Sequence, residues 1–263
     1  KQIAEGLHEH AGGFLGGRYL SSKLDGTFGE YFIIPDADMN LAVVPNGVSI
    51  QAAGLVGDMV TTGFSGVEGA NIQFGDTVVV IGIGPVGLMS VAGCVLRGAA
   101  EIYAVGHRPV TRELAMQYGA TATIDYQDGP IVEQVMKLTG GQQIEKVIIA
   151  GGEPTVFNDA LALVKYTGTV ANLAGHGRTE LLLPIYTNES GFGFCAHKTV
   201  TGGLCPGGRR RIERLMGMVK TGRFEPEKLI THRFYGLDGI EEAFDLMKSK
   251  NPEVIKPIIY FDK

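Results

Sequence analysis

The chain has 263 residues, which is too long for one minimal domain and suits a large domain with a smaller partner. Hydrophobic residues make up 44% of the chain, so it can bury a substantial core, and this argues against wholesale disorder. The formal net charge is −5 and no long basic stretch occurs, which argues against a nucleic-acid-binding surface.

The sequence carries no visible membrane or targeting signal. No apolar run reaches the roughly 18 residues of a membrane helix, and no signal peptide is visible. The three cysteines, Cys94, Cys195 and Cys205, form no CxxC pair, so a reducing cytoplasm is the expected location. The chain opens at Lys1 and its first residues resemble a loop from the middle of a domain, so we expect a segment to precede it.

Residues 1–57 are rich in glycine and contain short strand-like pieces, of which residues 28–34 are the clearest. These pieces predict part of a β-rich domain that would not fold alone. The pattern turns helical over residues 58–67, and Asp76 ends a short polar turn.

Apolar strands then alternate with helices of about ten residues. The expected strands cover residues 77–81, 102–105, 121–124, 147–150 and 169–173, with a sixth at 198–201. The expected helices cover residues 85–97, 111–118, 131–138 and 156–164. This alternation predicts an α/β fold, a Rossmann-type doubly wound parallel sheet with helices on both faces. Further on, we expect amphipathic helices at 209–220 and 239–248 and a closing strand at 256–261.

A glycine-rich turn follows the first strand of this sheet. Gly82, Ile83, Gly84, Pro85, Val86 and Gly87 fit the pattern G-x-G-x-x-G, with a strand before it and a helix after it. Gly82 would permit the tight turn, Gly84 would let a pyrophosphate approach the backbone, and Gly87 would let helix and strand pack closely. The free N–H groups of the helix start would meet the phosphate charge. The pattern therefore predicts a dinucleotide site.

The tip of the second strand indicates which dinucleotide is bound. Enzymes that use NAD place an acid there for the ribose 2′-hydroxyl, whereas this chain has Gly106, His107 and Arg108 and no carboxylate. An arginine can clamp a 2′-phosphate with two charge-assisted bonds. Tyr126, just after the third strand, would close the same pocket. We therefore expect NADPH rather than NADH, with a solvated Arg108 as the plainer alternative.

With these motifs, the chain resembles the zinc-dependent medium-chain alcohol dehydrogenases, and most closely their NADP-dependent secondary-alcohol branch. The resembling stretches are residues 58–64, 81–89, 105–109, 148–152, 197–209 and 229–232. The resemblance implies a β-rich catalytic domain, split between both ends of the chain, around the cofactor domain. It also implies zinc-assisted interconversion of small alcohols and ketones, usually in a homotetramer, with neither a nucleic acid nor a membrane as partner.

The same resemblance assigns roles to particular residues. Ile83 to Val86 would line the pyrophosphate, and Gly106, His107, Arg108 and Tyr126 the 2′-phosphate. Leu173, Ala174 and Gly175 would border the nicotinamide, and Lys250 would reach the cofactor from the C-terminal part. We place the domain boundaries at 1–61 for part of the catalytic domain, 62–202 for the dinucleotide-binding domain and 203–263 for the rest of the catalytic domain.

Two departures from the family pattern bear on the site. The serine that is usual at the second-strand tip is His107, and Gly6-Leu7-His8-Glu9 lies in a context that does not match the family's metal motif. We therefore assign no zinc ligation to His8 or Glu9. The remaining ligands are expected upstream of Lys1.

Asp58 is then the remaining metal candidate and the one catalytic residue assigned. Its neighbours along the chain are apolar, where an unpaired carboxylate would be costly and a zinc ion would neutralise that cost. A helix-capping aspartate is the plainer alternative. Cys94, Cys195, Cys205, His197 and His232 read as structural residues, and Arg209 to Arg211 as a solvated or inter-subunit face.

The expected function is hydride transfer between NADP(H) and a secondary alcohol or ketone, assisted by zinc. One alternative is a zinc-free NADPH-dependent quinone or enone reductase, which needs no ligand at Asp58. A second is a cofactor-binding fragment or subunit without turnover. We expect the segment alone to be inactive.

Overall fold

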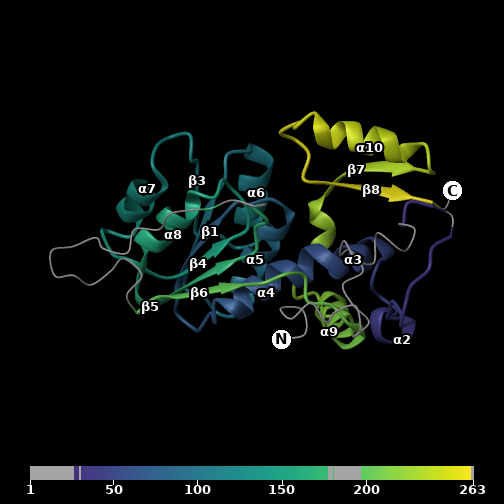
Figure 1. Cartoon of the computed structure of the whole chain (residues 1–263), viewed down its shortest axis with the longest axis horizontal. Coiled ribbons are helices and arrows are strands. Elements are labelled where there is room, and N and C mark those ends of the chain that lie inside the picture. Colours follow the sequence, from purple (N-terminus) through teal and green to yellow (C-terminus); the bar gives the residue numbers. More distant parts are fainter. Residues whose placement is uncertain (1–26, 30, 177–179, 181–196, 262–263) are drawn as a thin grey trace.

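The computed structural model describes residues 27–29, 31–176, 180 and 197–261. Its centre is a parallel sheet whose strands run in the order β3-β2-β1-β4-β5-β6 (Figure 1). The strands are β1 (Thr77–Ile81), β2 (Glu101–Val105), β3 (Ala122–Ile124), β4 (Ile144–Ile149), β5 (Val164–Asn172) and β6 (Thr199–Gly202). This is the Rossmann strand order: successive strands are added outward on one side of β1 and then, from β4 on, on its other side, which leaves a crevice at the strand ends between β1 and β4.

Helices cover both faces of the sheet because successive strand residues point to opposite sides. Val78 and Val80 belong to one buried core, which also contains residues of α4 (Thr61–Gly69), α5 (Pro85–Leu96) and α6 (Pro109–Gln117). Val79 and Ile81 belong to the other, with residues of α7 (Ile131–Leu138) and α8 (Val156–Leu163). The predicted doubly wound parallel sheet is confirmed.

The regular elements described before the sheet are helices. It contains α2 (Ala37–Asn40), α3 (Ile50–Leu55) and a π-helical turn, η2 (Val56–Val60), that runs directly into α4. The strand predicted at residues 28–34 is wrong for its described part, which is bent or irregular chain. Tyr31 and Ile33 are exposed there, and no described strand pairs with this segment, so its backbone lacks the ladder that a strand requires.

The C-terminal part forms a second, smaller sheet. After α9 (Arg209–Lys220) and a short 3₁₀ turn, η3 (Pro226–Leu229), strands β7 (Ile230–Tyr235) and β8 (Lys256–Tyr260) pair in parallel. Helix α10 (Gly239–Lys248) connects them and packs beside them (Figure 1). The closing strand is confirmed, whereas β7 was not predicted as a strand. Among the described residues, no helix has the length and hydrophobicity needed to cross a membrane.

Candidate cofactor and metal site

The glycine turn after β1 is held by close backbone packing. Gly82 has φ +88°, a left-handed conformation that favours glycine, and a Cβ there would lie 2.6 Å from Gly151. A Cβ on Gly87 would lie 2.0 Å from the carbonyl oxygen of Gly82, so the first turn of α5 lies directly against the strand end. Gly84 differs from both, because no atom lies within 4 Å of its Cβ position.

This arrangement leaves one open backbone face at the start of α5. Pro85 occupies the first turn of α5, where its missing N–H costs no hydrogen bond, and Gly84 is the residue before the helix. The free N–H groups of a helix start attract anions. The open side of Gly84 therefore fits the close approach of a phosphate that the sequence predicted for this residue.

The structure brings together the four residues predicted for the second-strand tip. The amide N–H of Gly106 donates to Ile124 of the neighbouring β3, and a Cβ on Gly106 would lie 2.3 Å from the Ile83 side chain. His107 lies beside the exposed Tyr126, with the ring centroids 5.9 Å apart. The Arg108 guanidinium is half-buried, which lowers its pKa, and it donates to the carbonyl of Val254. A guanidinium has five N–H donors, so others remain for a phosphate.

A buried carboxylate that the sequence analysis missed organises this tip. Asp125, 8% exposed, accepts from the Gln127 amide at 2.9 Å and from Arg112 at 3.2 Å, and its carboxylate contacts Nδ1 of His107 at 3.0 Å. The Gln127 N–H, together with His107 and Arg112, holds the pKa of Asp125 below its usual range. The sequence signal that could have placed Asp125 here was its position directly after β3. The carboxyl ends of parallel strands lie at the same edge of a sheet, so a residue after β3 comes close to the end of β2.

The Asp125 contact orients His107. The His107 Nδ1 atom is engaged by the carboxylate, so the Nε2 atom of the same ring is left for another partner. Arg112 is also anchored, by an Nε bond of 3.2 Å to the Thr123 hydroxyl, so it counterbalances Asp125 rather than extending into solvent. The negative charge of Asp125 is thus compensated by its own neighbours at a place where an isolated carboxylate would repel a phosphate.

The predicted nicotinamide edge follows β5 at the opposite side of the crevice. The Leu173 amide donates to Ile149 of β4 at 2.8 Å. The Asn172 side chain brackets Ala174, donating to its carbonyl and accepting from its amide, both at 3.1 Å. Gly175 is exposed, with no atom within 4 Å of its Cβ position. Gly175 therefore borders open space, whereas Leu173 and Ala174 are partly buried and pack against the two cores. Their role beside the nicotinamide stays a prediction.

Lys250 is not placed in contact with the other predicted residues. It is exposed, has φ +52°, and its amide donates to Met247 at the end of α10. Its segment nevertheless reaches the second-strand tip, since Val254, four residues later, accepts the hydrogen bond from Arg108. A role for Lys250 at the cofactor stays a prediction.

Asp58 lies in the π-helical turn η2, and its surroundings differ from those we expected. The side chain is exposed, so the prediction that the Asp58 carboxylate lies in an apolar setting is wrong. Its apolar neighbours Val56 and Val60 are buried, whereas Gly57 and Asp58 face outward. The helix-capping alternative also fails, because the residue before α4 is Val60. Asp58 accepts a hydrogen bond of 3.1 Å from the Thr62 hydroxyl. π-helical turns are frequent at functional sites.

Cys205 is a second residue at this corner that the sequence analysis set aside. Its thiol lies 3.4 Å from the carbonyl of Gly57, and its pKa is raised mainly by burial, with Asp58 also contributing. Cys94 is buried in the core as predicted, and Cys195, His8 and Glu9 lie outside the described residues. Within the described ranges, no group of three or more His, Cys, Asp or Glu side chains is arranged to hold a metal. The described residues therefore supply one candidate carboxylate and an adjacent thiol, which is less than a zinc ligand set.

Comparison with known proteins agrees with this architecture. The family model described as "Zinc-binding dehydrogenase" matches residues 85–220. The chain is 51% identical over 258 residues to an NADP-dependent isopropanol dehydrogenase of Thermoanaerobacter brockii, covering 98% of this chain and 73% of that protein. It is 48% identical over 258 residues to the enzyme of that name from Clostridium beijerinckii, with the same 98% and 73% coverage.

Solved structures lead to the same group. The zinc-dependent alcohol dehydrogenase 2 from Streptococcus pneumonia superposes with a TM-score of 0.77 at 28% identity, over 91% of this chain and 66% of that one. The alcohol dehydrogenase TADH from Thermus sp. ATN1 gives 0.76 at 25% identity, over 90% and 66%. The chain thus spans about two thirds of these structures and somewhat more of the curated relatives. This chain belongs to the zinc-binding dehydrogenase family.

Proposed function

We propose that this chain is the cofactor-binding part of an NADP-dependent oxidoreductase that interconverts secondary alcohols and ketones with the assistance of zinc. The observation that carries the proposal is the pairing of an open glycine turn at Gly84 with a cationic second-strand tip that holds Arg108 and His107. The names of the relatives, NADP-dependent isopropanol dehydrogenases, support the same cofactor and small ketones as substrates. A homotetramer and a cytoplasmic location remain proposals from the family resemblance.

The chain's own residues would bind and orient the cofactor. The start of α5 would offer backbone N–H groups to the pyrophosphate past the open side of Gly84. Arg108 and the Nε2 atom of His107 would hold the 2′-phosphate, with Asp125 fixing the imidazole. Leu173 to Gly175 would border the nicotinamide. NADP(H), when bound, supplies the hydride acceptor or donor, and this positioning would bring it to the substrate carbon.

Zinc would supply a Lewis acid that polarises the substrate oxygen. Asp58 is the residue we propose as one ligand, on the family resemblance and its exposed place in η2. The other ligands lie outside the described residues under this proposal.

Cofactor titrations test the central proposal. NADPH should bind more tightly than NADH, and Arg108→Ala should weaken NADPH on the order of ten- to a hundredfold, since a charge-assisted hydrogen bond contributes roughly 1.5–3 kcal/mol. NADH binding should be little affected, because it has no 2′-phosphate. The matched control is Arg233→Ala, which removes an exposed arginine from β7. Equal affinities for both cofactors in the unsubstituted chain would contradict the assignment.

A further inference from the structure

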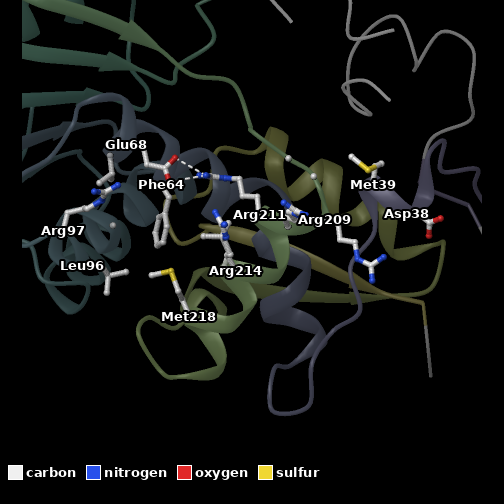
Figure 2. A pocket seen from close by; sticks show the side chains of 16 residues that line it. Asp38, Met39, Phe64, Glu68, Leu96, Arg97, Arg209, Arg211, Arg214 and Met218 are labelled. Carbon is white, nitrogen blue, oxygen red and sulfur yellow. Dashed lines mark hydrogen bonds and ion pairs between the residues drawn. The ribbon is translucent and has the colours of Figure 1, made fainter. Parts of the chain in front are cut away.

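A groove of about 660 Å³ lies between α4, α5 and α9, and none of the residues assigned to the cofactor or to zinc lines it (Figure 2). Its apolar part includes Phe64 of α4, Leu96 of α5 and Met218 of α9. In Figure 2 the α9 side chains Arg214 and Met218 lie opposite Phe64 and Leu96. A second hollow of about 350 Å³ shares Leu96, Arg214 and Met218 with it, so the space is elongated. Volumes of this size are typical of small-molecule sites.

The lining of the groove is strongly cationic in a chain whose net charge is −5. Five arginines and two carboxylates line it: Arg97, Arg209, Arg210, Arg211, Arg214, Asp38 and Glu68. Two of these arginines are paired, since Arg211 contacts Glu68 at 3.0 Å and Arg209 contacts Glu213 at 2.8 Å.

The other three arginines are exposed, and none of them is paired with another described residue. In the part of the chain that the structure describes, no carboxylate lies within 4.0 Å of Arg97, Arg210 or Arg214, and none of their guanidinium groups has a hydrogen-bond partner. Like charges gathered beside an apolar wall repel one another and raise the local concentration of anions. The groove therefore combines an apolar wall with three arginines that have no carboxylate partner among the described residues.

We propose that this groove binds an aliphatic phosphate monoester, with the phosphate on Arg97 and Arg214 and the chain against Phe64, Leu96 and Met218. The guanidinium fork matches phosphate oxygens in a bidentate manner. A phosphate monoester carries between one and two negative charges near neutral pH, which matches several cations better than a single carboxylate does. The elongated apolar hollow supplies the place for the alkyl chain.

Titration of the 263-residue chain with butyl, hexyl and octyl phosphate, each below its micelle concentration, tests the proposal. Each methylene buried should tighten binding about fourfold, because burial of one CH₂ contributes roughly 0.8 kcal/mol. Inorganic phosphate and octanol should each bind far more weakly than octyl phosphate. Excess NADPH should leave the affinity for octyl phosphate unchanged, because the cofactor residues lie elsewhere. Binding in the groove can therefore be confirmed or contradicted independently of the proposed cofactor site.

Substitutions in the groove complete the test. Arg214→Gln and Arg97→Gln should each weaken octyl phosphate about tenfold. Arg233→Gln on β7 makes the same charge change outside the groove and should have no effect. Met218→Gln should flatten the dependence on chain length without changing the binding of inorganic phosphate.

Three results would overturn the proposal. They are a lack of saturable binding, competition by NADPH, and equal loss of affinity in the Arg233→Gln control. If octyl phosphate fails to bind and Arg214→Gln also lowers the mass of an oligomer in sedimentation, the groove is a contact between copies of the chain instead.

Discussion

The strand-end crevice and the Asp58 corner lie in one chain, yet they differ in how much surrounding structure fixes them. At the crevice, Gly87 packs against the Gly82 backbone, Gly106 packs against Ile83, and buried Asp125 joins Arg112, the His107 ring and an amide N–H. At the corner, exposed Asp58 has one hydroxyl donor, Thr62, among the described residues.

This difference separates a preorganised site from an incomplete one. The geometry of the crevice is determined by contacts that exist without a ligand, so the cofactor can bind with little rearrangement. The carboxylate at the corner is exposed, and besides its place in the π-helical turn the Thr62 hydroxyl and the neighbouring Cys205 thiol position it. Substitutions of the packed residues in the first region should therefore change stability, whereas substitution of Asp58 should chiefly change ligand content.

The largest effect is expected from Gly87→Ala. The added methyl carbon would lie 2.0 Å from the Gly82 carbonyl oxygen, a backbone atom that cannot move without opening the turn. We expect a loss of about 3 kcal/mol in the free energy of unfolding, at the upper end of overpacking effects, measured by urea denaturation.

The matched control for Gly87→Ala is Gly84→Ala in the same turn. Its Cβ would meet open space at φ −73°, so stability should be unchanged or slightly higher. NADPH should nevertheless bind more weakly to this variant, because the methyl group occupies the side that the phosphate approaches. Equal destabilisation by both substitutions would contradict this account of the turn.

A smaller effect is expected from Asp125→Asn. The contacts of Asp125 favour its ionised form, so the variant should lose about 1–2 kcal/mol of unfolding free energy at pH 7. Because the folded pKa lies below the unfolded value of about 3.9, the contribution is complete above that pH and is lost as pH falls through the folded pKa. Urea denaturation should therefore give a constant difference between pH 7 and pH 5 that shrinks below pH 4. A difference that does not shrink at all as the pH falls below 4 would show that shape rather than charge is responsible.

The sequence predicted the sheet well because its signals are local. The bounds of β1, α7, α9 and α10 agree with the prediction, since each combines a clear apolar period with a glycine, proline or polar boundary. Strand β7 was missed because only Ile230, at its start, is buried, so its apolar alternation is weak.

The candidate site was predictable only where backbone geometry decides it. The roles of Gly82 and Gly87 in the turn follow from their spacing, and the structure confirms them. The partnership of Asp125 with His107 depends on the pairing of β2 with β3, which no local pattern encodes. The exposure of Asp58 was misjudged because a π-helical turn shifts which side chains face the core, and helical periodicity does not anticipate that shift.

The smallest effect on stability is expected from Asp58→Ala, and it tests the corner most directly. Asp58 is exposed and accepts a hydrogen bond from the neutral Thr62 hydroxyl, so its removal should change the metal-free unfolding free energy by less than about 1 kcal/mol. Glu133→Ala, an exposed acid on α7, is the matched control. In the 263-residue chain zinc should bind weakly, because one carboxylate is fewer than the usual three or four ligands.

In a protein that also carries the remaining ligands, Asp58→Ala should lower the zinc content per subunit, measured by atomic emission, while Glu133→Ala leaves it unchanged. Undiminished zinc in the Asp58→Ala protein would remove Asp58 from the ligand set, and zinc-free protein that still reduces enones with NADPH would favour the zinc-independent reductase instead.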